Sequence, residues 1–169
     1  MASGPRSADP AVRIDWLCAW PQHVASLAGA HVQAFGALQP GWTVDEATGE
    51  LAAHDRPGMI PATLVALDAG GGWLGSVSLL REDHPQITRY SPWLASLYVR
   101  PQARGHGLGR ALVRRAVAEA AALGTLRLYL YCTAALAGWY LAQGWRHHQS
   151  LQVGPLALQV LAIDCTEYA

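Results

Sequence analysis

The residues of this sequence with the clearest chemical potential form one short segment, RGHGLG, at residues 104–109. It lies between a β-rich run, SLYV, and a strongly helical run, RALVRRAVAEA. Glycines remove side chains from a turn, and the first N–H groups of a helix lack partners at the positive end of its dipole. An anion, most naturally a phosphate or pyrophosphate, can bind such N–H groups. We therefore predict a phosphate-bearing ligand at this turn.

The spacing of the glycines excludes two common nucleotide sites. A P-loop has a lysine and then Ser or Thr after its last glycine, whereas Arg110 and Ala111 follow Gly109 here. A dinucleotide site needs G-x-G-x-x-G and an acidic residue near the end of the next strand. This chain has G-x-G-x-G, and its next predicted strand, residues 125–133, contains no Asp or Glu.

Composition limits the class of protein. The 169 residues are 51% hydrophobic and 14% charged, as expected of a globular chain with a large core. Twelve basic and twelve acidic residues cancel, which argues against a nucleic-acid partner. Cys18, Cys132 and Cys165 have neither disulfide-framework nor zinc-ligand spacing, so we expect reduced cysteines and no metal.

The chain shows no targeting or membrane segment that we would assign. Asp9 and Asp15 interrupt the start where a signal peptide would be apolar. Residues 128–145 carry no charge, but they change from a strand-like to a helical pattern, with Gly138 and Gly144 between. We expect no membrane partner and a cytoplasmic location.

Hydrophobic periodicity predicts a mixed α/β (α+β) sheet in one domain over residues 11–169, after a flexible segment at residues 1–10. A capping box of Thr43 and Glu46 opens the second helix. The expected strands are 12–17, 61–68, 71–80, 93–99, 125–133 and 156–164, and the expected helices are 21–35, 43–54, 108–123 and 134–143. Whether residues 145–149 add a further strand before the last one is left open. The buried stripe of the third helix is expected at Leu108, Ala111, Leu112, Ala116, Val117, Ala120 and Leu123.

Residues 97–113, LYVRPQARGHGLGRALV, resemble the acyl-CoA-binding signature of the GNAT superfamily of N-acetyltransferases, [Q/R]-x-x-G-x-[G/A]. Arg104, Gly107 and Gly109 fit this pattern directly before the helix. A second frame, which starts at Gln102, lies too far from the helix start. The resemblance extends to TAALAGWYLAQGW and covers about residues 92–148. It implies a mostly antiparallel twisted sheet with a splayed central strand pair.

The resemblance also implies where acetyl-CoA binds as the acyl donor. The pantetheine arm would pair with the strand that contains Tyr98 and Val99, as an extra strand does. The backbone N–H of Leu97 would stabilise the oxyanion of the tetrahedral intermediate. The pyrophosphate would lie on the turn formed by Arg104, Gly105, His106, Gly107, Leu108, Gly109 and Arg110.

Tyr140 matches the tyrosine that protonates the leaving thiolate in many GNAT proteins. A phenol and a thiol differ by only about 1.5 pKa units, so a positioned tyrosine can donate this proton. The general base stays open. Trp93 occupies the position of the glutamate that some GNAT proteins use, and Glu82, Asp83, His84 or the solvent could take its role.

In similar folds the acceptor pocket is lined by the first two helices and the last hairpin. Those segments contain Phe35, Trp42, His31, His147 and His148. The sequence shows no acidic cluster that would indicate a polyamine or aminoglycoside acceptor, and no ligand spacing for a metal.

The predicted function is acetyl transfer from acetyl-CoA directly to a primary amine of a small molecule or peptide. No competing nucleophile is expected, because Cys132 lies on a strand without a neighbouring base. The alternative is a non-catalytic acyl-CoA-binding regulatory module. The acceptor, the length of the acyl group and the oligomeric state are left open, although many GNAT proteins form homodimers.

Overall fold

The computed structural model describes residues 11–168, so the segment 1–10 that we expected to be flexible lies outside the described residues. The strands are β1 (Arg13–Trp16), β2 (Ala62–Leu67), β3 (Trp73–Leu80), β4 (Trp93–Val99), β5 (Arg127–Cys132), β6 (Arg146–Val153) and β7 (Leu156–Asp164). The α-helices are α1 (Val24–Phe35), α2 (Val44–Ala53), α3 (Leu108–Ala122) and α4 (Ala134–Leu141). Short 3-10 turns lie at Leu17–Ala19, Pro21–His23, Pro101–Ala103 and Cys165–Tyr168. The predicted order of strands and helices is confirmed.

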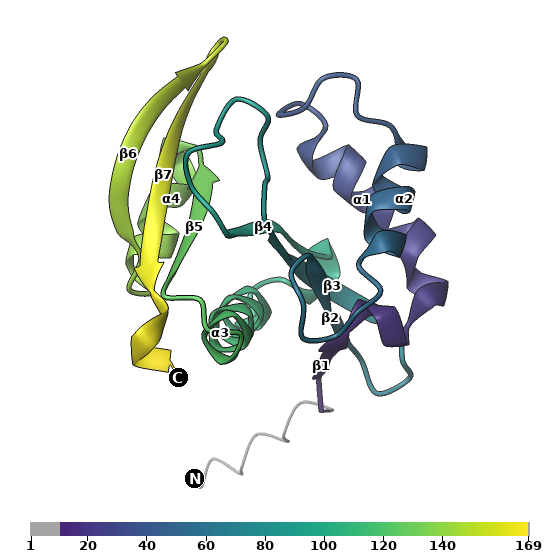
Figure 1. Cartoon of the computed structure of the whole chain (residues 1–169). Coiled ribbons are helices and arrows are strands. Elements are labelled where there is room, and N and C mark those ends of the chain that lie inside the picture. Colours follow the sequence, from purple (N-terminus) through teal and green to yellow (C-terminus); the bar gives the residue numbers. More distant parts are fainter. Residues whose placement is uncertain (1–10, 169) are drawn as a thin grey trace, which may run out of the picture.

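The strands form a 7-stranded sheet in the order β1-β2-β3-β4-β5-β7-β6. All neighbours are antiparallel except β4 and β5, which are parallel and share a single registered pair, Trp93 with Tyr129. Beyond this pair the two strands diverge, so β1–β4 and the β5–β7–β6 group form two arms (Figure 1). The splayed central pair that the resemblance implied is confirmed.

Local signals in the sequence correctly placed several elements. Thr43 and Glu46 form the predicted capping box: the Glu46 N–H donates to Thr43 Oγ1 at 3.2 Å, and the Thr43 N–H donates to Glu46 Oε2 at 2.9 Å. Asp68 Oδ1 accepts from the N–H groups of Gly70 and Gly72, both at 2.9 Å, and so closes the hairpin between β2 and β3, the second and third of the expected strands. The helix expected from Pro21 begins there only as a 3-10 turn and becomes α1 at Val24.

Helix α3 lies at the base of the two arms and packs on β2, β3 and β4 and on the C-terminal turn (Figure 1). The expected stripe is wrong at Ala111 and Leu123, which are exposed, whereas Val113 is buried. The buried face is therefore shifted away from Ala111 and toward Val113, because α3 packs on the sheet and on the C-terminal turn. The other members of the stripe are buried as expected: Leu108, Leu112, Ala116, Val117 and Ala120.

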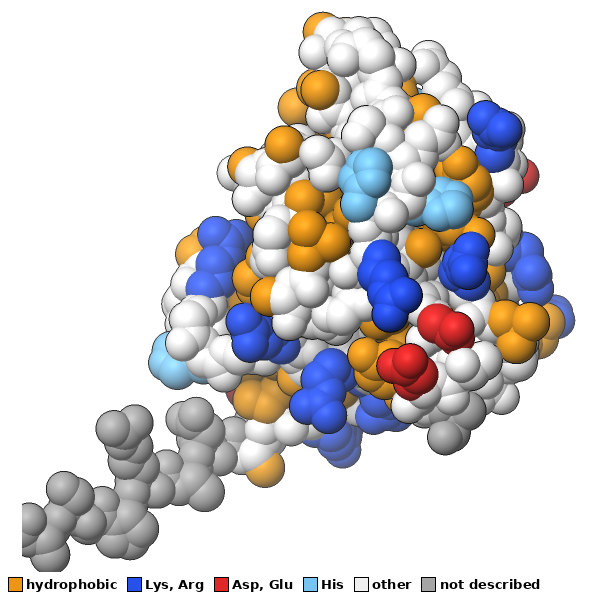
Figure 2. Space-filling view, turned by 90° about the vertical axis from the view of Figure 1, so that its left-hand side faces the viewer, with side chains coloured by type: hydrophobic (Ala, Val, Ile, Leu, Met, Phe, Trp, Pro, Cys, Tyr) orange, Lys and Arg blue, Asp and Glu red, His pale blue; other side chains and the backbone are white. Residues whose placement is uncertain are grey.

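Three groups of apolar side chains hold these layers together. The largest joins α3 to the sheet, a second lies between β2–β3 and the helices α1 and α2, and a third lies beneath the loop of residues 81–92 on the β5–β7–β6 arm. The outer side of that arm shows arginines spread among hydrophobic and uncharged side chains (Figure 2). Among residues 11–168, no helix combines the length and apolarity needed to cross a membrane.

Candidate active site

The turn before α3 has an open surface at two of its glycines. Gly105 has φ of +80° and Gly107, which caps the helix, has φ of +81°, a left-handed conformation that favours glycine. A Cβ atom on either residue would meet no heavy atom within 4 Å. The Ala111 N–H donates to the carbonyl of Gly107 at 3.1 Å, so the N–H groups of residues 108–110 precede the helical hydrogen bonds. These features fit a phosphate group.

Gly109 and Arg104 have different roles in the same turn. A Cβ on Gly109 would lie 3.4 Å from the ring of Trp139, so this glycine allows α3 and α4 to pack closely. Arg104 Nε donates to the carbonyl of Val99 at 2.9 Å, and its guanidinium lies 5.8 Å from the ring centroid of Tyr98. Arg104 therefore ties the end of β4 to the glycine turn.

A cavity of about 570 Å³, here called the α3 cavity, lies against this turn. Of the residues that the resemblance assigned to acetyl-CoA binding, all except His106 line this cavity. The assigned residues in its wall are Leu97, Tyr98, Val99, Arg104, Gly105, Gly107, Leu108, Gly109, Arg110 and Tyr140.

Strand β4 carries a bulge beside this cavity. Ser76 on β3 pairs with Tyr98 and Ser78 pairs with Ala95, so Ser96 and Leu97 together face one residue, Val77. Ser96 has φ of +53°, an uncommon conformation for a residue with a side chain. The extra residue bends the strand and interrupts its regular pairing at Leu97.

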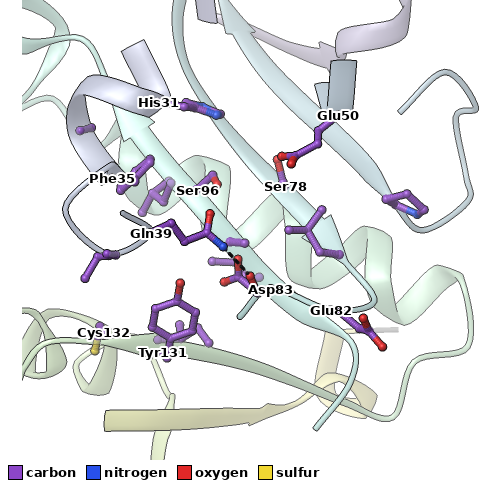
Figure 3. A pocket seen from close by; sticks show the side chains of 18 of the residues that line it. His31, Phe35, Gln39, Glu50, Ser78, Glu82, Asp83, Ser96, Tyr131 and Cys132 are labelled. Atoms are coloured by element: carbon purple, nitrogen blue, oxygen red, sulfur yellow. Dashed lines mark hydrogen bonds between the residues drawn. The ribbon is translucent and has the colours of Figure 1, made fainter. Parts of the chain in front are cut away.

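A second cavity of about 720 Å³, here called the α2 cavity, lies between α1, α2, β5 and the loop of residues 81–92 (Figure 3). The two cavities meet, because both are lined by Ala34, Phe35, Leu97, Leu136 and Tyr140. Leu97 and Tyr140 thus lie where a ligand in one cavity can meet a ligand in the other.

Tyr140 is suited to hold a proton at this junction. Its side chain is buried, and its hydroxyl makes no hydrogen bond with residues 11–168. Burial, together with the nearby Cys132, raises the pKa of Tyr140 above the ordinary tyrosine value. Burial also raises the pKa of the Cys132 thiol to about 11, so both groups are protonated at neutral pH.

The residues expected around an acceptor divide into two groups. His31, Phe35 and Trp42 line the α2 cavity. His147 and His148 do not, and their assignment to the acceptor pocket is wrong: they lie on β6, the edge strand beyond β7, whereas β5 and β7 supply residues to the cavity wall. There His147 Nε2 shares a 2.9 Å hydrogen bond with Ser150 Oγ, and the ring of His148 lies 4.8 Å from that of Tyr90.

The fold also brings together carboxylates that are separated in the sequence. Glu50 of α2 and Glu82 and Asp83 of the β3–β4 loop line the α2 cavity. The sequence showed no acidic cluster, whereas the fold places these three carboxylates in the wall of one cavity. Burial raises the pKa of Asp83 to about 7, and Asp83 in turn contributes to the raised pKa of Tyr131.

The third base candidate, His84, is buried outside the cavity. Its Nδ1 accepts from the Gln86 N–H at 3.1 Å, and its ring lies 5.7 Å from Tyr131. His84 does not line the α2 cavity, whereas its neighbours Glu82 and Asp83 do. Of the three candidates, Asp83 combines a place in the cavity with a pKa near neutrality.

Neutral polar groups line the floor of the α2 cavity on the side of α1 and α2. His31 Nε2 hydrogen-bonds with Ser76 Oγ at 2.9 Å. His54 Nδ1 bonds with Thr63 Oγ1 at 2.9 Å, which bonds with Ser78 Oγ at 2.8 Å. Burial lowers the pKa of His31 to about 4 and also lowers that of His54, so both imidazoles are neutral at pH 7. Glu50, His54 and Ser78 carried no sequence signal.

Comparison with known proteins identifies the family. A family model described as the acetyltransferase (GNAT) domain matches residues 61–147, just over half of the chain, including β4, the glycine turn, α3 and α4. The chain belongs to the GNAT acetyltransferase family. This membership confirms the predicted acetyl-CoA-dependent N-acetyltransferase. A search of curated protein sequences gives no significant match.

Solved GNAT structures share the whole fold. The spermidine N-acetyltransferase of Vibrio cholerae, in complex with CoA and spermine, is 18% identical and has a TM-score of 0.69 over 93% of this chain and 97% of that chain. The yncA protein of Salmonella typhimurium, solved with acetyl-CoA, is 20% identical, with a TM-score of 0.69 over 94% and 96%. An N-acetyltransferase of Staphylococcus aureus Mu50 is 18% identical, with a TM-score of 0.71 over 92% and 99%. At these identities the likeness concerns the fold.

In this GNAT enzyme, Trp93 occupies the position of the glutamate that some GNAT proteins use as the base, and its side chain is part of the core. The indole is fully buried with Ile87, Leu158 and Val160 and does not line the α2 cavity. Trp93 therefore offers no carboxylate to the α2 cavity, whereas Glu82 and Asp83 of the β3–β4 loop line it.

Proposed function

We propose that the enzyme transfers the acetyl group of acetyl-CoA directly to a primary amine, with the donor in the α3 cavity and the acceptor in the α2 cavity. The observation that carries this proposal is the junction of the two cavities at Leu97 and Tyr140. A single unit of residues 11–169 would perform the reaction.

The donor is held mainly by backbone groups. The open turn at Gly105 and Gly107 and the N–H groups at the start of α3 fit the pyrophosphate of acetyl-CoA. The pantetheine arm would extend along β4 toward the bulge, which places the thioester next to Leu97. Arg104 adds a positive charge at the same turn.

The reaction then needs an oxyanion donor and two proton transfers. The amine nitrogen attacks the thioester carbon, and the N–H of Leu97 stabilises the negative oxygen that forms. The intermediate collapses to the amide, and Tyr140 protonates the departing CoA thiolate. The burial that raises the pKa of Tyr140 would also raise that of the thiolate beside it, which keeps this transfer feasible.

Asp83 is the proposed general base. An amine that enters as an ammonium ion must lose a proton before it attacks, and the attacking nitrogen must lose another as the amide forms. A carboxylate with a pKa of about 7 is half ionised at neutral pH and can accept such a proton directly or through water. The net reaction converts acetyl-CoA and amine into amide and CoA thiol.

Thiol release from acetyl-CoA with a panel of primary amines tests the function. The enzyme should release CoA only when an amine is present, with formation of one acetylated product per thiol. The sequence contains no lysine, so the enzyme has no lysine side chains to give a self-acetylation background. A folded enzyme that binds acetyl-CoA but acetylates no amine would instead be the acyl-CoA-binding regulatory module.

The proposal also covers the location of the enzyme in the cell, its partners and its oligomeric state. A cytoplasmic location is supported by the three free cysteines, Cys18, Cys132 and Cys165. A nucleic-acid acceptor is disfavoured by the zero net charge of the chain. For the oligomeric state, β6 at the edge of the sheet is the surface on which we expect a second copy, and sedimentation velocity measures it.

A further inference from the structure

The α2 cavity holds more negative than positive charge. Glu50, Glu82 and Asp83 line it, and Arg81 is the one arginine that the described residues place there. The ion pairs found among residues 11–168 join Arg13 to Asp15, Arg56 to Asp55 and Arg115 to Glu119, so none involves these three carboxylates. His31 and His54 do not offset the charge, because burial lowers the pKa of both.

Asp83 is a partly buried carboxylate that lacks a partner. In the part of the chain from residue 11 to 168, its backbone carbonyl accepts from Gln39 Nε2 at 3.4 Å, but its side chain takes part in no hydrogen bond. A carboxylate that loses water without gaining a donor is costly to keep ionised, and burial alone raises the pKa of Asp83 to about 7. A cationic ligand would supply the missing donor.

The cavity is extended, and two of its three carboxylates, Glu50 and Glu82, lie away from the junction. In Figure 3, Phe35, Ser96 and Cys132 lie toward one end, Glu50 and Glu82 toward the other, and Asp83 between them. Phe35 belongs to the junction with the α3 cavity. Apolar side chains also line the cavity, among them Leu38, Trp42, Leu80 and Leu158.

We propose that the acceptor is a primary amine that carries a second positive charge, with an apolar chain between the two charged groups. The reacting nitrogen would lie at the junction within reach of Asp83, and the second cation would lie near Glu50 and Glu82. The apolar segment would contact the hydrophobic walls. This inference rests on the proposed function, since it names the substrate class of the same site.

The decisive experiment compares three acceptors with one carbon skeleton: 1,6-diaminohexane, hexylamine and 6-aminohexanoate. They differ in the charge at the end that does not react, which is positive, absent or negative. We expect kcat/KM for the diamine to exceed that for hexylamine by about tenfold, the size of a few partly exposed ion pairs, and 6-aminohexanoate to be the poorest acceptor. Equal values for the diamine and hexylamine would overturn the inference and leave the proposed function intact.

Two variants test whether Glu50 and Glu82 cause the preference for 1,6-diaminohexane over hexylamine. Glu50→Gln and Glu82→Gln keep the size of the side chain and remove its charge, so each should lower the ratio of diamine to hexylamine activity, and the double variant should bring it close to one. Glu167→Gln is the control, because Glu167 is exposed on the C-terminal turn outside the cavity, and its ratio should match that of the parent enzyme. An unchanged ratio in the double variant would overturn the role of these residues.

A second readout separates the two proposals if no amine is acetylated. That result would overturn the proposed function, and equilibrium titration of the CoA-saturated enzyme with the same three ligands would then decide the inference. Tighter binding of 1,6-diaminohexane than of hexylamine, lost in the double variant, supports a site for dications. Equal binding of the two contradicts it.

Discussion

Arg104 Nε donates a 2.9 Å hydrogen bond to the carbonyl oxygen of Val99, across the turn that joins β4 to α3. This bond joins the two proposed parts of the donor site, the strand for pantetheine and the glycine turn for pyrophosphate. It also occupies a carbonyl at the end of the strand along which the ligand would pair.

The first prediction concerns this bond. Arg104→Gln should weaken acetyl-CoA binding about tenfold, since it removes a positive charge and a charge-assisted hydrogen bond at an anion site. Calorimetric titration measures the affinity. Arg114→Gln is the matched control, because Arg114 is an exposed residue of α3 outside both cavities. Tighter binding by the Arg104→Gln variant would instead mean that Arg104 competes with the ligand for Val99.

The second prediction separates conformation from charge at Gly107. Gly107→Ala should cost about 1–2 kcal/mol of stability, because alanine is strained at φ of +81°, and should reduce CoA affinity only modestly. Gly107→Glu adds a negative charge at the proposed pyrophosphate site and should abolish binding. Thermal melts report folding of both variants, and titration reports affinity. Full affinity in a folded Gly107→Glu variant would remove the phosphate site from this turn.

The third prediction concerns the proposed acid. Tyr140→Phe should lower kcat by about 10²-fold or more, the usual contribution of a general acid, while the dissociation constant for acetyl-CoA changes little. Single-turnover kinetics and titration separate the two effects. Tyr129→Phe is the control, because Tyr129 is partly buried and lines neither cavity. If turnover by the Tyr140→Phe variant equals that of the parent, Tyr140 only packs against Trp139 and Trp145.

The fourth prediction is a pH profile. Asp83 acts as a base only when ionised, so kcat/KM should rise with pH through about 7 and then level. Arg81, Glu50, Glu82 and Tyr131 face the same cavity and can displace the midpoint. Asp83→Asn should lose this rise and lower kcat/KM by about 10²-fold. A parent profile that is flat between pH 6 and 8 would exclude Asp83 as the base.

The fifth prediction concerns stability. The folded-state pKa of Asp83 lies above its unfolded value, so the folded enzyme binds more protons, and stability falls as pH rises from about 4 to 7. Asp83→Asn avoids this cost and should be more stable by about 1–2 kcal/mol at pH 8, with little difference at pH 4. The free-energy cost of ionising Asp83 in the folded enzyme is moderate because the cavity is open to solvent. Denaturant melts at both pH values measure the difference, and an Asp83→Asn variant less stable than the parent at pH 8 would contradict it.

The sequence could predict the glycine turn and the elements around the α3 cavity, the proposed donor site, because their signals are local. Three glycines, an amphipathic helix and an aromatic pair lie in neighbouring segments, and their positions follow from helix capping and periodicity. The bulge at Ser96 and Leu97 was not predicted, because it depends on how β4 pairs with β3. The burial of Val113 in place of Ala111 was not predicted either, since it depends on which elements cover α3.

The residues of the α2 cavity, the proposed acceptor site, could not be predicted from the sequence in the same way. Glu50, His54 and Ser78 come from separate elements, and no pattern relates them until α2 and the sheet pack together. His147 and His148 were expected in the pocket because the last hairpin lines it in similar folds. The order β5-β7-β6 places them one strand too far out. The negative charge of the cavity could not be predicted either, because it depends on which carboxylates the packed elements place in the wall. The raised pKa of Asp83 likewise depends on its burial in the folded chain.

The junction of the two cavities also has a kinetic consequence. Each cavity has its own exposed rim, with Arg104 and Arg110 at one and Glu50 and Glu82 at the other. Neither substrate therefore has to leave before the other enters, and both can be bound when the bond forms. With the donor and the acceptor in the cavities proposed for them, the enzyme would work through a ternary complex, and substitutions at one rim should change the arrival rate of one substrate alone.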